Sequence, residues 1–148
     1  MKAVKFIEMI LLSLFMSLNF ASCGKEDIDD SKLEGEWLFK SDVGYILDKN
    51  TNEKVDDWNE GIGENPEKAI VKKVKDNVYS IQSYIKINGN WKADGGISQF
   101  RLEGNKIIFE GSEDDVRTIT TLTSDKLVIV SESEDDEYKY YEEVTYTR

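Results

Sequence analysis

The chain contains no histidine, one cysteine and one proline in 148 residues. Histidine is the usual general base near neutral pH and the commonest metal ligand, so its absence excludes Ser-His and Cys-His catalysis and argues against a zinc site. A single cysteine cannot form a disulfide within one chain. The composition therefore indicates no metal and no cofactor, and it favours a binding protein over an enzyme.

Basic residues are also scarce, since 19 lysines and arginines stand against 30 aspartates and glutamates, which gives a net charge of −11. Nucleic-acid phosphates would be repelled by such a chain, and so would anionic lipid headgroups. We therefore expect no nucleic-acid partner and no membrane binding through a basic patch. Any attachment to a membrane must come from a lipid anchor.

The first 22 residues have the layout of a secretory signal peptide. Two lysines near the start precede an apolar core at Met9–Leu18, and the small residues Ala21 and Ser22 precede Cys23. The apolar core is too short for a transmembrane helix, which needs about 20 such residues. We therefore expect residues 1–22 to be removed on export.

The stretch Phe20-Ala21-Ser22-Cys23 resembles the lipobox of bacterial lipoproteins, with Phe20 in place of the usual aliphatic residue. The resemblance implies cleavage before Cys23, a lipid on its sulfur and acylation of the new amino terminus. Lipidation would explain why a protein with no other cysteine keeps this one.

The stretch Gly24-Lys25-Glu26-Asp27 resembles the signal that sends lipoproteins of Bacteroidetes-type bacteria to the outer face of the outer membrane. The resemblance implies an outer-membrane protein that is lipid-anchored and faces the cell exterior. A solvated tether over residues 23–32 is the other interpretation, because the segment is polar enough to stay disordered, and both can hold.

Residues 33–148 are predicted to form a single domain that is β-structured throughout. Apolar and β-branched runs alternate with Gly, Asn and Asp turns, which is typical of sequential strands. We expect strands at Gly35–Ser41, Gly44–Asp48, Ala69–Lys75, Val78–Ile87, Asn90–Leu102, Lys106–Glu110, Val116–Thr123, Lys126–Glu132 and Tyr138–Thr147.

Two features of this pattern need interpretation. Asp94-Gly95-Gly96 is either a bulge within one strand or a turn that divides it, and Lys49–Lys68 is expected to be one long loop. Eight or nine strands joined mostly by short turns predict an all-β fold, a single antiparallel up-and-down β-barrel, because closure removes the sheet edges.

Gly35-Glu36-Trp37, near the start of the first predicted strand, resembles the Gly-x-Trp signature of lipocalins. Calycin-type barrels pair this tryptophan with an arginine at the end of the last strand, and Arg148 matches that position. The resemblance implies a lipocalin-like barrel over residues 33–148 in which Trp37 and Arg148 close the barrel and have a structural role. A guanidinium over an indole contributes roughly 0.5–2 kcal/mol. The helix that lipocalins carry before the last strand has no counterpart in the sequence.

The last predicted strand offers the first group of candidate ligand-binding residues. Alternation places one acid among three tyrosines on one face, and these residues are Tyr138, Tyr140, Glu142 and Tyr146. An inward Glu142 would be a polar anchor in an apolar pocket. The alternative is a bulge at residues 141–143 that turns the acid to solvent, and the cost of burying a carboxylate favours it.

The expected long loop offers a second candidate, Trp58, which either stacks on a ligand or caps the mouth of the barrel. The spacing of Asp48, Asn50 and Asn52 echoes a calcium loop. Glu53 stands where that motif needs glycine, however, so a polar hairpin loop is the better interpretation.

Two functions of different classes fit this sequence. The first is a carrier that binds a small apolar or amphipathic molecule, and the second is a surface module that binds a glycan or a protein through its loops around a filled barrel. The volume of the interior discriminates between them, because small barrels are either filled or hollow. A hydrolase with paired carboxylates is a third possibility, but no recognisable pair is present.

Overall fold

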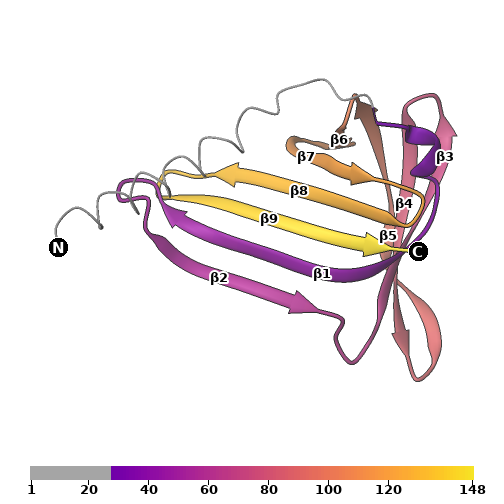
Figure 1. Cartoon of the computed structure of the whole chain (residues 1–148). Coiled ribbons are helices and arrows are strands. Elements are labelled where there is room, and N and C mark those ends of the chain that lie inside the picture. Colours follow the sequence, from indigo (N-terminus) through magenta and orange to yellow (C-terminus); the bar gives the residue numbers. More distant parts are fainter. Residues whose placement is uncertain (1–27) are drawn as a thin grey trace, which may run out of the picture.

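The computed structural model describes residues 28–148, which form a short 3-10 helix and nine strands (Figure 1). The elements are η1 (Asp30–Lys32), β1 (Gly35–Asp48), β2 (Lys54–Gly61), β3 (Glu67–Lys75), β4 (Val78–Ile87), β5 (Asn90–Glu103), β6 (Lys106–Phe109), β7 (Ser112–Leu122), β8 (Lys126–Glu134) and β9 (Tyr138–Thr147). The predicted signal peptide and Cys23 lie outside the described residues. Within residues 28–148, no helix is long and apolar enough to cross a membrane.

The strands form one antiparallel sheet that closes on itself. Their order is β2-β1-β3-β4-β5-β6-β7-β8-β9, and a further pairing of β1 with β9 joins the two sides. Eight strands therefore make a closed barrel, and β2 is an additional strand outside the ring. The predicted fold class, an all-β antiparallel up-and-down barrel, is confirmed.

Strand β1 shares its two edges among three partners. One edge pairs with β9 from Leu38 to Asp48, whereas the other pairs first with β3 at Gly35–Leu38 and then with β2 at Ser41–Leu47. We call the half of the barrel beside β3 the closed end and the half beside β2 the open end. In Figure 1, β1, β2, β8 and β9 run together to the left, away from β3, β4 and β5.

The strand prediction was wrong at β1 and β2. The two strands expected at Gly35–Ser41 and Gly44–Asp48 are one strand, whose register shifts at a bulge between Phe39 and Ser41. The loop expected at Lys49–Lys68 contains β2. Seven of the eight residues of β2 are exposed, so this strand lacks the apolar alternation by which strands are recognised.

Asp94-Gly95-Gly96 forms a bulge within β5 and does not divide it. The register with β4 runs from Ile81 opposite Ser98 to Ser83 opposite Asp94, so β5 carries extra residues at this point. Gly95 has a φ of 81°, a conformation that glycine adopts without steric cost.

The hydrophobic core fills the closed end. Its largest fully buried side chains are Trp37, Tyr79, Phe100, Leu33 and Ile119. The rings of Tyr79 and Phe100 stack with their centroids 5.5 Å apart. These side chains come from five different segments of the chain, so the core holds the strands of the ring together.

The folded part begins before residue 33, the domain boundary expected from the sequence. Ile28 packs against the core, and the Tyr79 hydroxyl donates a hydrogen bond to Asp30 with an O–O distance of 2.6 Å. Residues 28–32 therefore belong to the barrel domain and not to a tether. The polar composition of this segment concealed the two contacts that anchor it.

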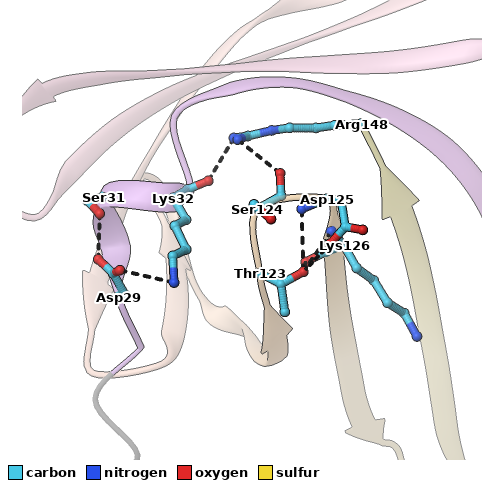
Figure 2. Close-up of polar contacts among 8 residues, drawn as sticks. All are labelled: Asp29, Ser31, Lys32, Thr123, Ser124, Asp125, Lys126 and Arg148. Atoms are coloured by element: carbon cyan, nitrogen blue, oxygen red, sulfur yellow. Dashed lines mark hydrogen bonds and ion pairs between the residues drawn. The ribbon is translucent and has the colours of Figure 1, made fainter.

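The first and last strands are joined by Trp37 and Arg148, as the lipocalin resemblance implied. Trp37 is fully buried and donates from Nε1 to the Leu33 carbonyl at 2.8 Å, while the Arg148 guanidinium lies 4.1 Å from the centre of its ring. Arg148 Nη2 also donates to the carbonyls of Lys32 and Glu34 at 2.7 and 2.6 Å. Figure 2 shows the guanidinium reaching the backbone of Lys32 on one side and Ser124 on the other.

Trp37→Ala should lower the free energy of unfolding by about 3–5 kcal/mol, because it leaves a large cavity in a close-packed core. Arg148→Ala should cost less, since its guanidinium stays partly in water. Because the two side chains touch, the double variant should be destabilised by less than the sum of the single effects. Urea denaturation of the four proteins measures this coupling, and strictly additive effects would contradict a joint role in closure.

Candidate functional site

A small cavity lies within the barrel, lined mainly by side chains of the core and by those packed against it. Its volume is about 60 Å³, and its lining is apolar except for Arg117 and the hydroxyl of Tyr146. Trp37 and Leu33 form part of its wall from the closed end, and Phe109 and Ile129 form part of it from β6 and β8. Pockets for whole small molecules usually measure about 300–1,000 Å³, and an engineered cavity of about 150 Å³ binds benzene. This cavity therefore has room for the end of a ligand and not for a whole one.

The bulge in β1 decides which side chains face the inside beyond this cavity. Phe39 pairs with Tyr146 before the bulge, and Asp42 pairs with Val144 after it. The extra residue shifts the alternation by one position, so that Asp42 and not Ser41 shares the inner face with Val144. Simple alternation along β1 would have placed Asp42 outside.

Trp58 of β2 lies on this inner face, directly over a glycine. It is paired with Gly44, its indole covers the position where a Gly44 side chain would stand, and its Nε1 donates to Asp42 Oδ1 at 2.8 Å. An aromatic side chain that covers a cross-strand glycine restores packing that the glycine cannot supply. Trp58 is half-buried, so one part of its ring stays accessible at the open end.

Glu142 also lies on the inner face, which corrects the preference for a bulge at residues 141–143. The register of β9 with β8 is continuous from Lys139 to Thr147, so Glu142 keeps its place in the alternation, opposite Gly44. Partial burial and the nearby charge of Asp42 raise the pKa of the Glu142 carboxyl, and the charge of Arg117 opposes them. Glu142 is half-buried, which reduces the desolvation cost that had argued against an inward position.

Arg117 is the positive charge of this region, and it is already paired. Its Nε and Nη2 donate to the two carboxylate oxygens of Asp115 at 3.2 and 3.1 Å. These hydrogen bonds raise the pKa of the guanidinium, which also lies 5.3 Å from the centre of the Phe109 ring. Neither Asp42 nor Arg117 stands out in the sequence as a site residue. The spacing of Asp115 and Arg117, two apart on a strand, was a signal that they share a face.

The three tyrosines share a face of β9 as predicted but are spread along it. Tyr146 lines the cavity and meets Phe39 edge-on, with ring centroids 6.2 Å apart. Tyr138 and Tyr140 lie at the far end of the strand, with ring centroids 6.5 Å apart, and the Tyr140 hydroxyl donates to Asp135 at 2.7 Å. Of the predicted residues, Tyr146 lines the cavity, Trp58 and Glu142 lie on the inner face toward the open end, and Tyr138 and Tyr140 lie apart from them.

The segment that echoes a calcium loop forms the turn between β1 and β2. Asp48 Oδ1 accepts hydrogen bonds from the backbone of Asn50 and Thr51 at 2.8 and 2.9 Å, which holds the turn. Within the described part of the chain, no three Asp, Glu, His or Cys side chains are grouped to hold a metal ion.

Gly44→Ala should displace Trp58, because a methyl group there would overlap the indole and lie 2.5 Å from the Tyr141 carbonyl oxygen. We expect a lower melting temperature and a change in tryptophan emission, since the indole must leave its position over the strand. Gly61→Ala is the matched control, because a methyl group at Gly61 of the same hairpin meets nothing within 4 Å. Equal effects of the two changes would contradict the packing of Trp58 on Gly44.

Comparison with solved structures supports this architecture. Ex-FABP, a siderocalin described as functioning through dual ligand specificities, matches with a TM-score of 0.50 and 8% identity, covering 79% of this chain and 74% of its own. The bovine lipocalin allergen Bos d 2 matches with a TM-score of 0.51 and 20% identity, covering 82% of this chain and 75% of its own. No protein-family model and no curated protein sequence matches the chain. At these identities the likeness concerns the fold, and the fold of this protein is that of the lipocalin-type β-barrel.

Proposed function

We propose that this protein binds a small apolar or amphipathic molecule at the open end of its barrel. The observation that carries the proposal is the apolar cavity of about 60 Å³ with Arg117 and Tyr146 in its wall. An apolar chain end would enter this cavity. The polar end of the ligand would lie on the inner face beside Trp58 and Glu142.

The arrangement has the chemistry of a small-molecule site. Such sites combine apolar and aromatic walls with a few polar groups that fix the orientation of the ligand. Here the polar groups are Glu142, Asp42 and Arg117, and the aromatic walls are Trp58 and Tyr146. Barrels of this size commonly hold one small ligand, which supports the proposal at the level of the fold.

A second candidate function is a surface module that binds a glycan or a protein. Two observations favour it: the cavity is too small for a whole ligand, and β2 exposes seven of its eight residues beside the open end. In that case the open end would be a contact surface, and the apolar interior would serve stability alone. We propose no catalytic activity for either function.

We further propose that the protein is an outer-membrane lipoprotein of the Bacteroidetes type, anchored through Cys23 and facing the cell exterior. The support is the lipobox resemblance of residues 20–23 and the segment Gly24-Lys25-Glu26-Asp27. With Ile28 packed against the core, the segment between anchor and barrel would be residues 24–27. So short a connection would hold the barrel close to the membrane.

Ligand binding is tested with an apolar fluorescent probe and the chain that carries Cys23→Ser. We expect saturable binding that Trp58→Ala weakens by roughly two- to tenfold, the effect of losing one aromatic contact. Trp91→Ala is the matched control, because Trp91 lies on the outer face of β5, where Lys68 Nζ is 4.5 Å from the centre of its ring. Probe binding that neither variant changes would favour the surface module.

Anchoring is tested by Cys23→Ser in the native host, which removes the sulfur that would carry the lipid. We expect the protein to leave the membrane fraction, because a net charge of −11 offers no electrostatic attraction to anionic lipid. Fractionation before and after a high-salt wash measures the change. Continued membrane association after the wash would contradict a lipid anchor at Cys23.

A further inference from the structure

The inner face of the barrel, taken together with the cavity, carries more negative than positive charge. Arg117 is the one charged residue among those that line the cavity, and both oxygens of Asp115 already accept hydrogen bonds from it. The charge of Asp115 offsets that of the guanidinium and reduces its attraction to the carboxylate of a ligand. Among the charges facing the inside, Asp42 and Glu142 therefore decide which ligand charge is favoured.

These two acids belong to neighbouring strands on the same inner face. Asp42 is paired with Val144, and the adjacent pair joins Gly44 to Glu142. Neither carboxylate forms an ion pair with a lysine or arginine among residues 28–148. With Arg117 and Asp115 balancing each other, Asp42 and Glu142 together contribute a formal charge of −2 to this inner face when both are ionised.

Aromatic rings accompany the acids. The Trp58 indole lies over Gly44 and donates from Nε1 to Asp42, and Tyr146 and Phe39 meet edge-on at the neighbouring pair of β1 and β9. The faces of aromatic rings attract cations, and aromatic walls are used for ammonium groups in particular. The same groups repel an anion twice, through the carboxylates and through the ring faces.

We propose that the ligand is a cationic amphiphile, whose ammonium group lies between Trp58, Asp42 and Glu142 and whose apolar chain enters the cavity. The inference rests on the proposed function and adds the charge of the ligand to it. The net charge of −11 on the chain acts in the same direction, because it raises the local concentration of cations. The Asp115 side chain, by pairing with Arg117, weakens the opposite preference for fatty-acid-like anions.

The test compares three probes with the same eight-carbon chain: octylammonium, octanol and octanoate. Titration calorimetry with the full chain should give the tightest binding for octylammonium and the weakest for octanoate. Octanoate binding as tightly as octylammonium, or more tightly, would overturn the inference and leave the proposed function standing. Saturable binding of none of the three would overturn the proposed function as well.

Variants distinguish two sources of cation binding: a local ion pair with Asp42 or Glu142, and general attraction to an acidic protein. Asp42→Asn and Glu142→Gln should each weaken octylammonium binding by roughly two- to fivefold and weaken octanol binding by less, because octanol carries no charge. Glu143→Gln is the matched control, since it removes the same charge from the next residue of β9, on the outer face. An equal loss in the control would overturn the inference, because the attraction would then come from the net charge. Retained octanol binding and an unchanged melting temperature show that each variant keeps its fold and cavity.

Discussion

One constraint shapes this barrel: β1 has two edges and three partners. Its pairing with β9 continues along most of its length, so its other edge must be divided between β3 and β2. Where β3 is the partner, Ala69 and Val71 turn inward and the ring closes over a packed core. Where β2 is the partner, β1 is no longer paired with a strand of the ring on that edge, and the outer edge of β2 has no partner strand among the described residues. The division of β1 therefore separates a stable end from an accessible one.

The two ends differ in what their inner faces contain. At the closed end the inner face is apolar, and the polar atoms that approach it are hydrogen-bonded, as Trp37 Nε1 is to the Leu33 carbonyl and the Tyr79 hydroxyl is to Asp30. Toward the open end the inner face carries Asp42, Glu142 and Arg117. The raised pKa of Glu142 reflects a carboxylate in an environment that disfavours its charge. Groups with perturbed ionisation are often found at functional sites, and Glu142 and Arg117 on this part of the inner face are two such groups.

The fold could be predicted from the sequence because the patterns that indicate it, alternation within a strand and turn residues between strands, each lie within a short stretch of the chain. Alternation in β4 and the turn residues between strands identify most of the ring, and Gly35, Trp37 and Arg148 identify how it closes. Two features could not be predicted. Strand β2 is exposed on both faces, so it has no apolar pattern, and the bulge in β1 depends on pairing with a strand about 100 residues later in the chain.

The candidate site was only partly predictable for the same reason. Trp58 and Glu142 were identified as candidates by residue type and position, but their neighbours were not. Asp42 reaches the inner face through the bulge, and Arg117 comes from β7, far from both in sequence. A site assembled from β1, β2, β7 and β9 depends on long-range register, which composition and periodicity do not contain.

The free edge of β2 has a consequence for how copies of this protein behave toward one another. A strand with unpaired backbone groups is a template on which another chain can add its own strand, the first step of sheet extension and fibre growth. Strand β2 carries Asp56, Asp57 and Glu60 against the single Lys54. Two such edges approaching each other bring like charges together before any backbone hydrogen bond can form. The acids of β2 therefore protect the protein against self-association at the place where its barrel is left open.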